Sequence, residues 1–170
     1  GTLMIEAAMK ALNIPPCIRR KFSAQNFGFI DEIVWREERQ RGIDGVRRDA
    51  AFFGYGFDVD PAAVELTKQN AKKAGVFSRV LITEQDVRSL TLRDDLTLIA
   101  CNPPYGERML EQRSAQRLYG AFGRHLKYAD GWKKYIISSE PEFEHYFGRQ
   151  AVKKRKLYNG RLQCNVYMYY

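Results

Sequence analysis

Residues 52–75, FFGYGFDVDPAAVELTKQNAKKAG, decide the fold of this chain. The first eight are aromatic and β-prone, which predicts a strand whose glycines let another backbone approach closely. Asp60 followed by Pro61 predicts a helix start, because aspartate caps the first turn and proline fits the first helical position. Gly75 then ends the helix as a cap. A strand that passes directly into a helix is typical of a parallel sheet.

The rest of the chain repeats this alternation. We expect helices at 2–13, 32–41, 114–128 and 141–147, and strands at 80–83, 96–101, 134–138, 153–158 and 163–169. The last two strands flank Asn159-Gly160, a strong hairpin signal. The sequence therefore predicts an α/β fold with a mostly parallel sheet that ends in an antiparallel hairpin. The polar and charged stretch 23–49 is interpreted as an excursion, not a second domain.

Composition narrows the class of protein. The chain has 170 residues, 45% of them hydrophobic, which fits one globular domain and excludes a disordered chain. No apolar run approaches the roughly 20 residues of a membrane span, and no secretory signal opens the chain. We therefore expect a cytoplasmic protein without membrane contact.

The net charge suggests a binding partner, and the cysteines and histidines bear on disulfides and metal sites. The net charge of +8 favours a polyanion, most simply nucleic acid. The three cysteines and two histidines are scattered, so neither a disulfide framework nor a metal site is expected.

Polar residues follow each predicted parallel strand, where ligands bind in such sheets. Asp58 ends the first of these strands, and its carboxylate could accept hydrogen bonds from both hydroxyls of a ribose. Asp86 follows the next strand and could accept one from an adenine amino group. A solvated strand-end carboxylate and an ordinary loop aspartate remain the alternatives.

The third strand end carries the sequence NPPY, residues 102–105. Pro103 and Pro104 fix the backbone and remove two donors, so their carbonyls can face a cleft. Asn102 adds a side-chain oxygen, and Tyr105 can stack on a flat ring. Together they favour a clamp for a planar group that bears an NH₂, with a rigid proline turn as the alternative.

NPPY after a hydrophobic strand resembles motif IV of the S-adenosylmethionine-dependent amino-group methyltransferases. These methylate adenine N6, cytosine N4, guanine N2 or a glutamine amide. NPPYGER (102–108), the opening 1–22 and the ending 153–170 resemble one branch more closely, the bacterial 23S rRNA guanine-N2 methyltransferases, long labelled N6-adenine DNA methylases. The resemblance spans essentially the whole chain and implies a Rossmann-like class I methyltransferase fold.

The resemblance implies roles around the target base. Asn102 and the Pro103 carbonyl would hold the amino group, within a clamp that includes Pro104. Tyr105 would stack on the extruded base, and Arg108 would meet a phosphate or the base.

The resemblance also implies a cofactor site for S-adenosylmethionine. Asp58 would bind the ribose and Asp86 the adenine amino group, with Asn102 beside the reacting methyl. Gly1 and Thr2 match the end of the glycine-rich cofactor loop, where a helix N-terminus suits the methionine carboxylate.

The C-terminal hairpin carries the RNA contacts that we expect. Lys153, Lys154 and Arg155 of the run KKRK would bind phosphates, and Asn159 of LYNG would lie on the substrate side. Phosphate contacts give affinity without sequence choice. An edge strand protected by its charge is an equally good interpretation of KKRK.

The chain departs from the family at its start. The family has a first strand, with an acidic residue and further glycines, between the strand ending at Asp58 and the one ending at Asn102. We therefore expect 1–170 to be a methyltransferase catalytic domain that is incomplete at its N-terminus, with the RNA-binding THUMP region of the parent protein upstream.

The leading hypothesis is methylation of an exocyclic amino group in RNA, with guanine N2 of 23S rRNA as the target. The alternatives are a tRNA guanine-N2 enzyme, a DNA adenine-N6 enzyme, a release-factor glutamine methyltransferase and, in another class, a non-catalytic RNA-binding module.

Overall fold

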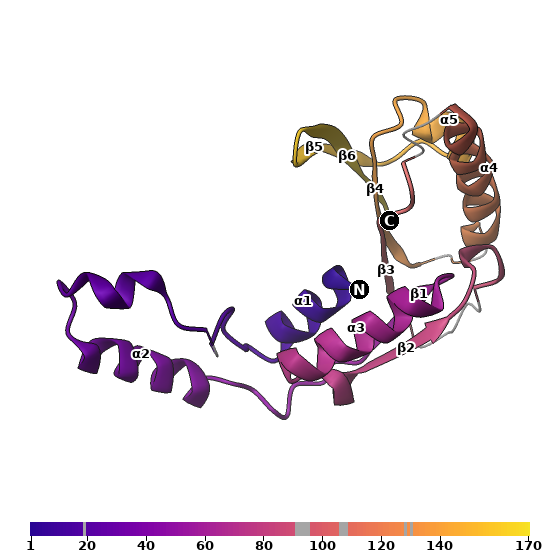
Figure 1. The fold of residues 1–170 in the computed structure, drawn as a ribbon. Coiled ribbons are helices and arrows are strands. Elements are labelled where there is room, and N and C mark those ends of the chain that lie inside the picture. Colours follow the sequence, from indigo (N-terminus) through magenta and orange to yellow (C-terminus); the bar gives the residue numbers. More distant parts are fainter. Residues whose placement is uncertain (19, 91–95, 106–108, 128, 130) are drawn as a thin grey trace. The chain divides into compact units, whose positions relative to one another are not determined.

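The computed structural model covers residues 1–170 and describes all of them except 19, 91–95, 106–108, 128 and 130 (Figure 1). The chain forms two compact units, Gly1–Gln85 and Asp86–Tyr170. Each unit buries its own cluster of hydrophobic side chains.

The first unit is a two-stranded parallel sheet with helices. Its elements are α1 (Thr2–Ala11), η1 (Ser23–Phe27), α2 (Glu32–Asp44), β1 (Gly54–Asp58), α3 (Pro61–Ala74), η2 (Phe77–Arg79) and β2 (Val80–Glu84). Gly54 of β1 lies opposite Val80 of β2, and Asp58 lies opposite Glu84. Both strands therefore end at the same edge.

The junction of β1 and α3 confirms the strand–cap–helix prediction. The Asp60 carboxylate accepts a hydrogen bond from the Ala62 amide at 2.9 Å, as an N-cap does. Gly75 ends α3 with φ of 76°, the left-handed conformation that glycine adopts without strain.

Aliphatic side chains and close backbone approach hold the first unit together. Its buried residues are Ile5, Ala8, Leu12, Val64, Ala71, Val76, Val80 and Ile82. Gly54 and Gly56 face Met4 of α1, and a Cβ placed on Gly56 would lie 2.6 Å from Met4 Cε. The glycines of β1 thus let α1 pack directly on the strand.

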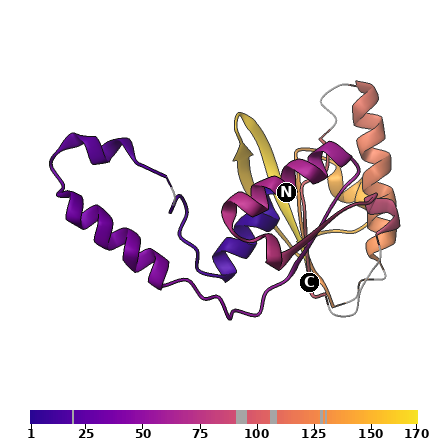
Figure 2. The ribbon, with the colours of Figure 1, turned by 60° about the horizontal axis from the view of Figure 1, so that its bottom comes forward.

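Residues 13–46 form an arm that leaves the unit after α1 and returns before β1 (Figures 1 and 2). The Arg47 amide donates to the Leu12 carbonyl at 2.8 Å and closes its base. Along the arm, Phe22 stacks on Trp35 with ring centroids 6.1 Å apart. Helix α2 runs past the predicted end at 41, because the cap forms at Gly45.

The second unit holds a four-stranded sheet. Its elements are η3 (Val87–Ser89), β3 (Leu98–Cys101), α4 (Met109–Leu126), β4 (Lys133–Ser138), α5 (Phe143–Phe147), β5 (Lys153–Asn159) and β6 (Leu162–Tyr169). The strand order is β3-β4-β6-β5, in which β3 and β4 are parallel and β6 pairs antiparallel with both neighbours. The α/β fold with a parallel sheet and a C-terminal antiparallel hairpin is confirmed.

The hairpin turn lies one residue later than its sequence signal indicated. Asn159 pairs with Leu162, so the two turn residues are Gly160 and Arg161. Of the two, only Gly160 has a positive φ, 62°. Glycine at the first turn position suits the type II′ geometry, whereas an Asn-Gly turn would be type I′.

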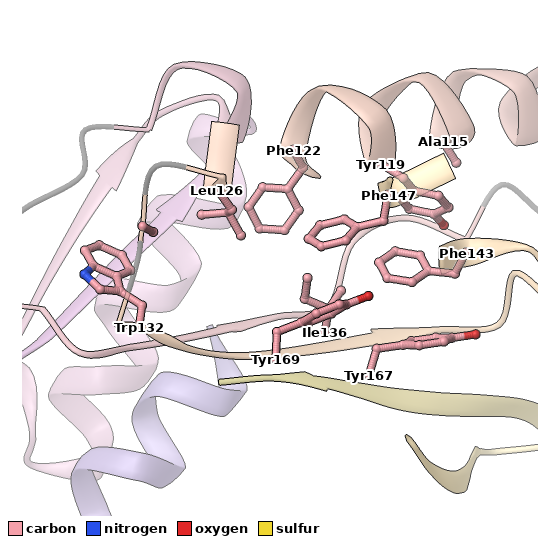
Figure 3. Close-up of a cluster of buried hydrophobic side chains, with 11 residues drawn as sticks. Ala115, Tyr119, Phe122, Leu126, Trp132, Ile136, Phe143, Phe147, Tyr167 and Tyr169 are labelled. Atoms are coloured by element: carbon pink, nitrogen blue, oxygen red, sulfur yellow. The ribbon is translucent and has the colours of Figure 1, made fainter. Parts of the chain in front are cut away.

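Aromatic rings fill the core of the second unit. In Figure 3, side chains of α4 such as Phe122 face Ile136 of β4 and Tyr169 of β6. The buried rings are Tyr119, Phe122, Trp132, Phe143, Phe147, Tyr167 and Tyr169. A Cβ on Gly123 would lie 1.9 Å from the carbonyl oxygen of Phe147, so α4 and α5 touch through backbone at this glycine.

The central strand that the family resemblance leads us to expect stays a prediction. Within the described residues, β1 pairs only with β2, and β3 pairs only with β4.

Candidate functional site

The NPPY turn follows directly from β3. Pro103 is buried, whereas Asn102 and Pro104 are exposed and Tyr105 is half-buried. The Tyr105 hydroxyl donates a hydrogen bond to Asn102 Oδ1 at 2.6 Å. This bond fixes the tyrosine ring beside the amide, so the two side chains expected to contact a flat amino-bearing ring lie together.

The Pro104 carbonyl is not free, contrary to our expectation. It accepts a hydrogen bond at 2.7 Å from the hydroxyl of Tyr119, whose side chain is fully buried in α4. From the sequence, Tyr119 is predicted only to lie in the helix at 114–128. Its hydroxyl was the one available signal, because a buried phenol usually needs a partner.

The thiol beside the turn is neutral. Burial raises the pKa of Cys101 to about 11. The residue that precedes Asn102 therefore carries no charge near neutral pH, and the amide of Asn102 faces no neighbouring thiolate.

The C-terminal hairpin reaches the NPPY turn. The pKa of the Tyr105 phenol is raised, and burial is the largest cause. Hydrogen bonding by Asn159 and Asn102 acts against this rise, whereas the neighbouring Cys164 adds to it. Cys164 lies opposite Leu157 in the β5–β6 pair, so it shares a face with Asn159 two residues on. The structure thus brings Asn102, Tyr105 and Asn159 together.

A buried glutamate lies after β4, the strand that pairs with β3. Glu140, 6% exposed, follows β4 and accepts a hydrogen bond from Gln116 of α4 at 3.1 Å. Its backbone carbonyl accepts one from the Tyr167 hydroxyl at 3.2 Å. The sequence does not reveal Glu140, since a lone glutamate after a strand gives no sign of burial.

Asp58 stands at the exposed end of β1, in the first unit. Its Oδ1 accepts a hydrogen bond from the Asp60 amide at 3.1 Å. Among the described residues its Oδ2 has no donor, so one carboxylate oxygen is open to a ligand.

Asp86 is held by a neighbour. The Arg88 side chain donates from Nε at 2.9 Å and from Nη2, and the Arg88 amide donates at 2.8 Å. These hydrogen bonds, the side-chain ones first, lower the pKa of Asp86 to about 2. An adenine amino group would have to share this carboxylate with Arg88, a competitor that the spacing DVR could have revealed.

Gly1 and Thr2 begin α1. Gly1 is the N-cap, without a side-chain hydrogen bond, and its α-carbon packs so closely on α3 that a Cβ would lie 2.1 Å from Thr67 Cγ2. The first backbone hydrogen bond runs from the Ile5 amide to the Gly1 carbonyl at 3.2 Å. The earlier amides of the helix are thus available to an anion.

The basic residues of β5 are exposed. Lys154 forms an ion pair with Glu144 at 2.7 Å, while Lys153 and Arg155 have no ion pair within the described part of the chain. Arg108 lies outside the described residues.

No helix in the described residues is long and apolar enough to cross a membrane. Nor do the described residues contain a group of three or more metal-ligating side chains.

The α/β fold, in which the NPPY turn follows a parallel strand and an antiparallel hairpin ends the chain, defines the class of protein: a Rossmann-like methyltransferase fold. More particularly, the chain belongs to the RMKL-like methyltransferase domain family, whose sequence model matches residues 1–168.

Relatives agree with this assignment. The chain is 32% identical over 170 residues to the "Putative RNA methyltransferase YpsC" of Bacillus subtilis. The match covers all of this chain and 44% of that protein. It is 35% identical to the "Ribosomal RNA large subunit methyltransferase K/L" of Hahella chejuensis, over 99% of this chain and 25% of that protein. The chain thus spans less than half the length of these two relatives.

Among solved structures, one described as "SMU.472, a putative methyltransferase complexed with SAH" matches with a TM-score of 0.94 and 33% identity. The match covers all of this chain and 45% of that one.

Proposed function

We propose that this chain methylates an exocyclic amino group in RNA with S-adenosylmethionine as the methyl donor, and that the target is guanine N2 of 23S ribosomal RNA. The observation that carries the proposal is the hydrogen bond between Tyr105 and Asn102, which sets ring and amide side by side in a chain of methyltransferase family. The names of the relatives support an RNA substrate.

Taken unit by unit, the residues present have side chains or amides of the kind that the cofactor needs. Asp58 offers an exposed carboxylate oxygen to a ribose, and the uncapped start of α1 at Gly1 and Thr2 offers amides to a carboxylate. Asp86 offers its carboxylate to the adenine amino group beside Arg88. When bound, the cofactor supplies an electrophilic methyl group carried on a sulfonium.

The chain's own residues act on the amino group of the base. An amide oxygen has two lone pairs, so Asn102 Oδ1 can accept from the base while it holds the Tyr105 hydroxyl. The Pro103 carbonyl has no donor among the described residues and would accept the second amino hydrogen. Both bonds favour the pyramidal nitrogen of the transition state over the flat ground state, which is how binding becomes catalysis.

Four residues complete the proposed substrate side. Tyr105 would stack on the extruded base, because proteins recognise single RNA bases by stacking them on aromatic side chains. Arg108, Lys153 and Asn159 would contact the RNA around it. In the parent protein an upstream THUMP region would select the RNA, and the ribosomal substrate would place the protein in the cytoplasm.

Calorimetric titration of S-adenosylhomocysteine tests the cofactor site. We expect binding to the chain and its loss in Asp58→Asn, which keeps the shape of the side chain and removes its charge. Asp49→Asn, at an exposed aspartate of the same unit, is the matched control and should bind normally. Binding that survives Asp58→Asn would contradict the ribose assignment, and no binding to the unsubstituted chain would contradict the cofactor proposal.

Transfer of tritium from labelled cofactor to ribosomal RNA tests the chemistry. Asn102→Ala should abolish transfer and leave cofactor binding intact, because its oxygen contacts the amino group. The labelled nucleoside should be N2-methylguanosine. Label on adenine would overturn the guanine assignment, and cofactor binding without any transfer would favour the non-catalytic alternative.

A further inference from the structure

The β5–β6 hairpin has one sign of charge. Residues 153–169 contain five basic residues, Lys153, Lys154, Arg155, Lys156 and Arg161, and no acidic one. Only Lys154 has an ion pair within the described part of the chain, with Glu144. Four cations therefore stand on this hairpin without a protein carboxylate to balance them.

These cations lie on an open edge. β5 is the last strand of its sheet, and six of its seven residues are exposed. In Figure 1 the β5–β6 ribbon reaches away from α4 and α5, which belong to the same unit. Charge on an edge strand also prevents edge-to-edge aggregation, so the cations by themselves have a sufficient protective explanation.

Tyr158 is not explained by protection of the edge strand against aggregation. Its side chain is 63% exposed, and Lys156 Nζ lies 5.8 Å from the centre of its ring. An exposed ring beside a cation is the arrangement that stacks a base and neutralises its phosphate in single-stranded nucleic acid. A double helix would offer no unstacked base to such a ring.

The hairpin also lies at the proposed site. Asn159, the neighbour of Tyr158, approaches the phenol of Tyr105. Successive strand residues point to opposite faces, so Arg155 shares the face of Asn159, while Lys156 and Tyr158 share the other. An RNA strand that leaves Tyr105 and crosses the edge of β5 would meet cations on both faces of the hairpin. On the face opposite Asn159 it would also meet the exposed ring of Tyr158.

We propose that the free edge of β5 binds an unpaired RNA segment next to the target nucleotide, with Tyr158 stacked on a flanking base and Arg155, Lys156 and Arg161 on its phosphates. The inference rests on the proposed function and names the form of its substrate: a single strand at the edge of the hairpin, in addition to the one extruded base at Tyr105.

Fluorescence anisotropy of the 170-residue chain with a labelled RNA of about 12 nucleotides, single-stranded or annealed to its complement, tests this. We expect tighter binding of the single strand. Tyr158→Ala should weaken it about tenfold, within the range for one lost base stack. Tyr158→Phe should retain it, because the ring remains.

Tyr170→Ala is the matched control, since Tyr170 is 56% exposed and lies outside the hairpin. It should bind as the unsubstituted chain does. Lys156→Ala should reduce the slope of log affinity against log salt by about 0.7, the value for one phosphate contact to a single strand.

Equal affinity for duplex and single strand, or single-strand affinity unchanged by Tyr158→Ala, would overturn the inference. The binding assay contains no cofactor, so this failure is distinct from failure of the proposed function. In that second case the calorimetric titration or the tritium transfer fails, while Tyr158→Ala still weakens binding of the single strand.

Discussion

The two units of the molecule bury different kinds of side chain. Residues 1–85 have an aliphatic core, whereas residues 86–170 have a core of aromatic rings. Two of these rings carry hydroxyls that bond to backbone near the NPPY turn, from Tyr119 to Pro104 and from Tyr167 to Glu140. In the second unit, therefore, the same side chains stabilise the fold and hold the backbone of the candidate site. In the first, Asp58 stands at an exposed strand end, apart from the core.

The largest effect is expected from Gly123→Ala in the aromatic unit. The new Cβ would meet the Phe147 carbonyl oxygen at 1.9 Å, and a backbone atom cannot yield unless α5 moves. We expect the free energy of unfolding to fall by about 3 kcal/mol, the upper end of the usual cost of overpacking. Urea denaturation followed by near-ultraviolet circular dichroism, which reports the rings, measures it.

The same substitution in the aliphatic unit is the control. In Gly56→Ala the Cβ meets Met4 Cε at 2.6 Å, the far end of a flexible side chain that can rotate away. The loss should be about 1 kcal/mol. Equal losses at Gly56 and Gly123 would remove the contrast between side-chain and backbone contacts.

A smaller effect on stability, but a larger one on activity, is expected from Tyr119→Phe. The change leaves the Pro104 carbonyl without its buried donor and should cost about 1–2 kcal/mol. Tyr167→Phe removes a comparable hydroxyl that bonds to Glu140. If Tyr119 positions the turn, methyl transfer falls further in Tyr119→Phe than in Tyr167→Phe at similar stability. Parallel losses of activity would mean that both hydroxyls act only through the fold.

The smallest effect concerns Asp86, the carboxylate that follows β2. Arg88 lowers the pKa of Asp86 to about 2, so this pair stabilises the fold above the ordinary aspartate pKa near 4. That contribution is lost as the pH falls from about 4 to about 2. We expect Arg88→Ala to be slightly less stable than the unsubstituted chain at pH 6, with a much smaller difference near pH 2, where about half of the Asp86 carboxyls are protonated.

Urea denaturation at a series of pH values measures this difference. Because the Arg88 side chain is 64% exposed, salt should shrink the difference further. A difference that persisted unchanged at pH 2 would show that Arg88 stabilises the chain through contacts other than Asp86.

Local signals in the sequence predicted much of the fold. The Asp60 cap, the Gly75 end and the alternation of strands with helices depend on residues close in the chain, and the structure has them where the pattern indicated. Asn102 and Tyr105 lie together for the same reason, since three positions separate them in a rigid turn.

The remaining features depend on contacts between distant residues. Apolar spacing cannot tell that the Tyr119 hydroxyl reaches a carbonyl fifteen positions away. The hairpin turn lies one residue later than predicted, because the burial of Tyr167 and Tyr169 determines strand register together with turn preference. Burial of Glu140 likewise follows from the helices packed around it.

The base of the arm has a consequence for how the chain can change. Since the Arg47 amide bonds to the Leu12 carbonyl, the backbone re-enters the first unit where it left. Among the described residues of 13–46 none is fully buried, although Ile14 packs against the buried cluster of that unit. Beyond Ile14 the arm can therefore vary in length and sequence, or accept an inserted reporter domain, while α1 and β1 keep their packing.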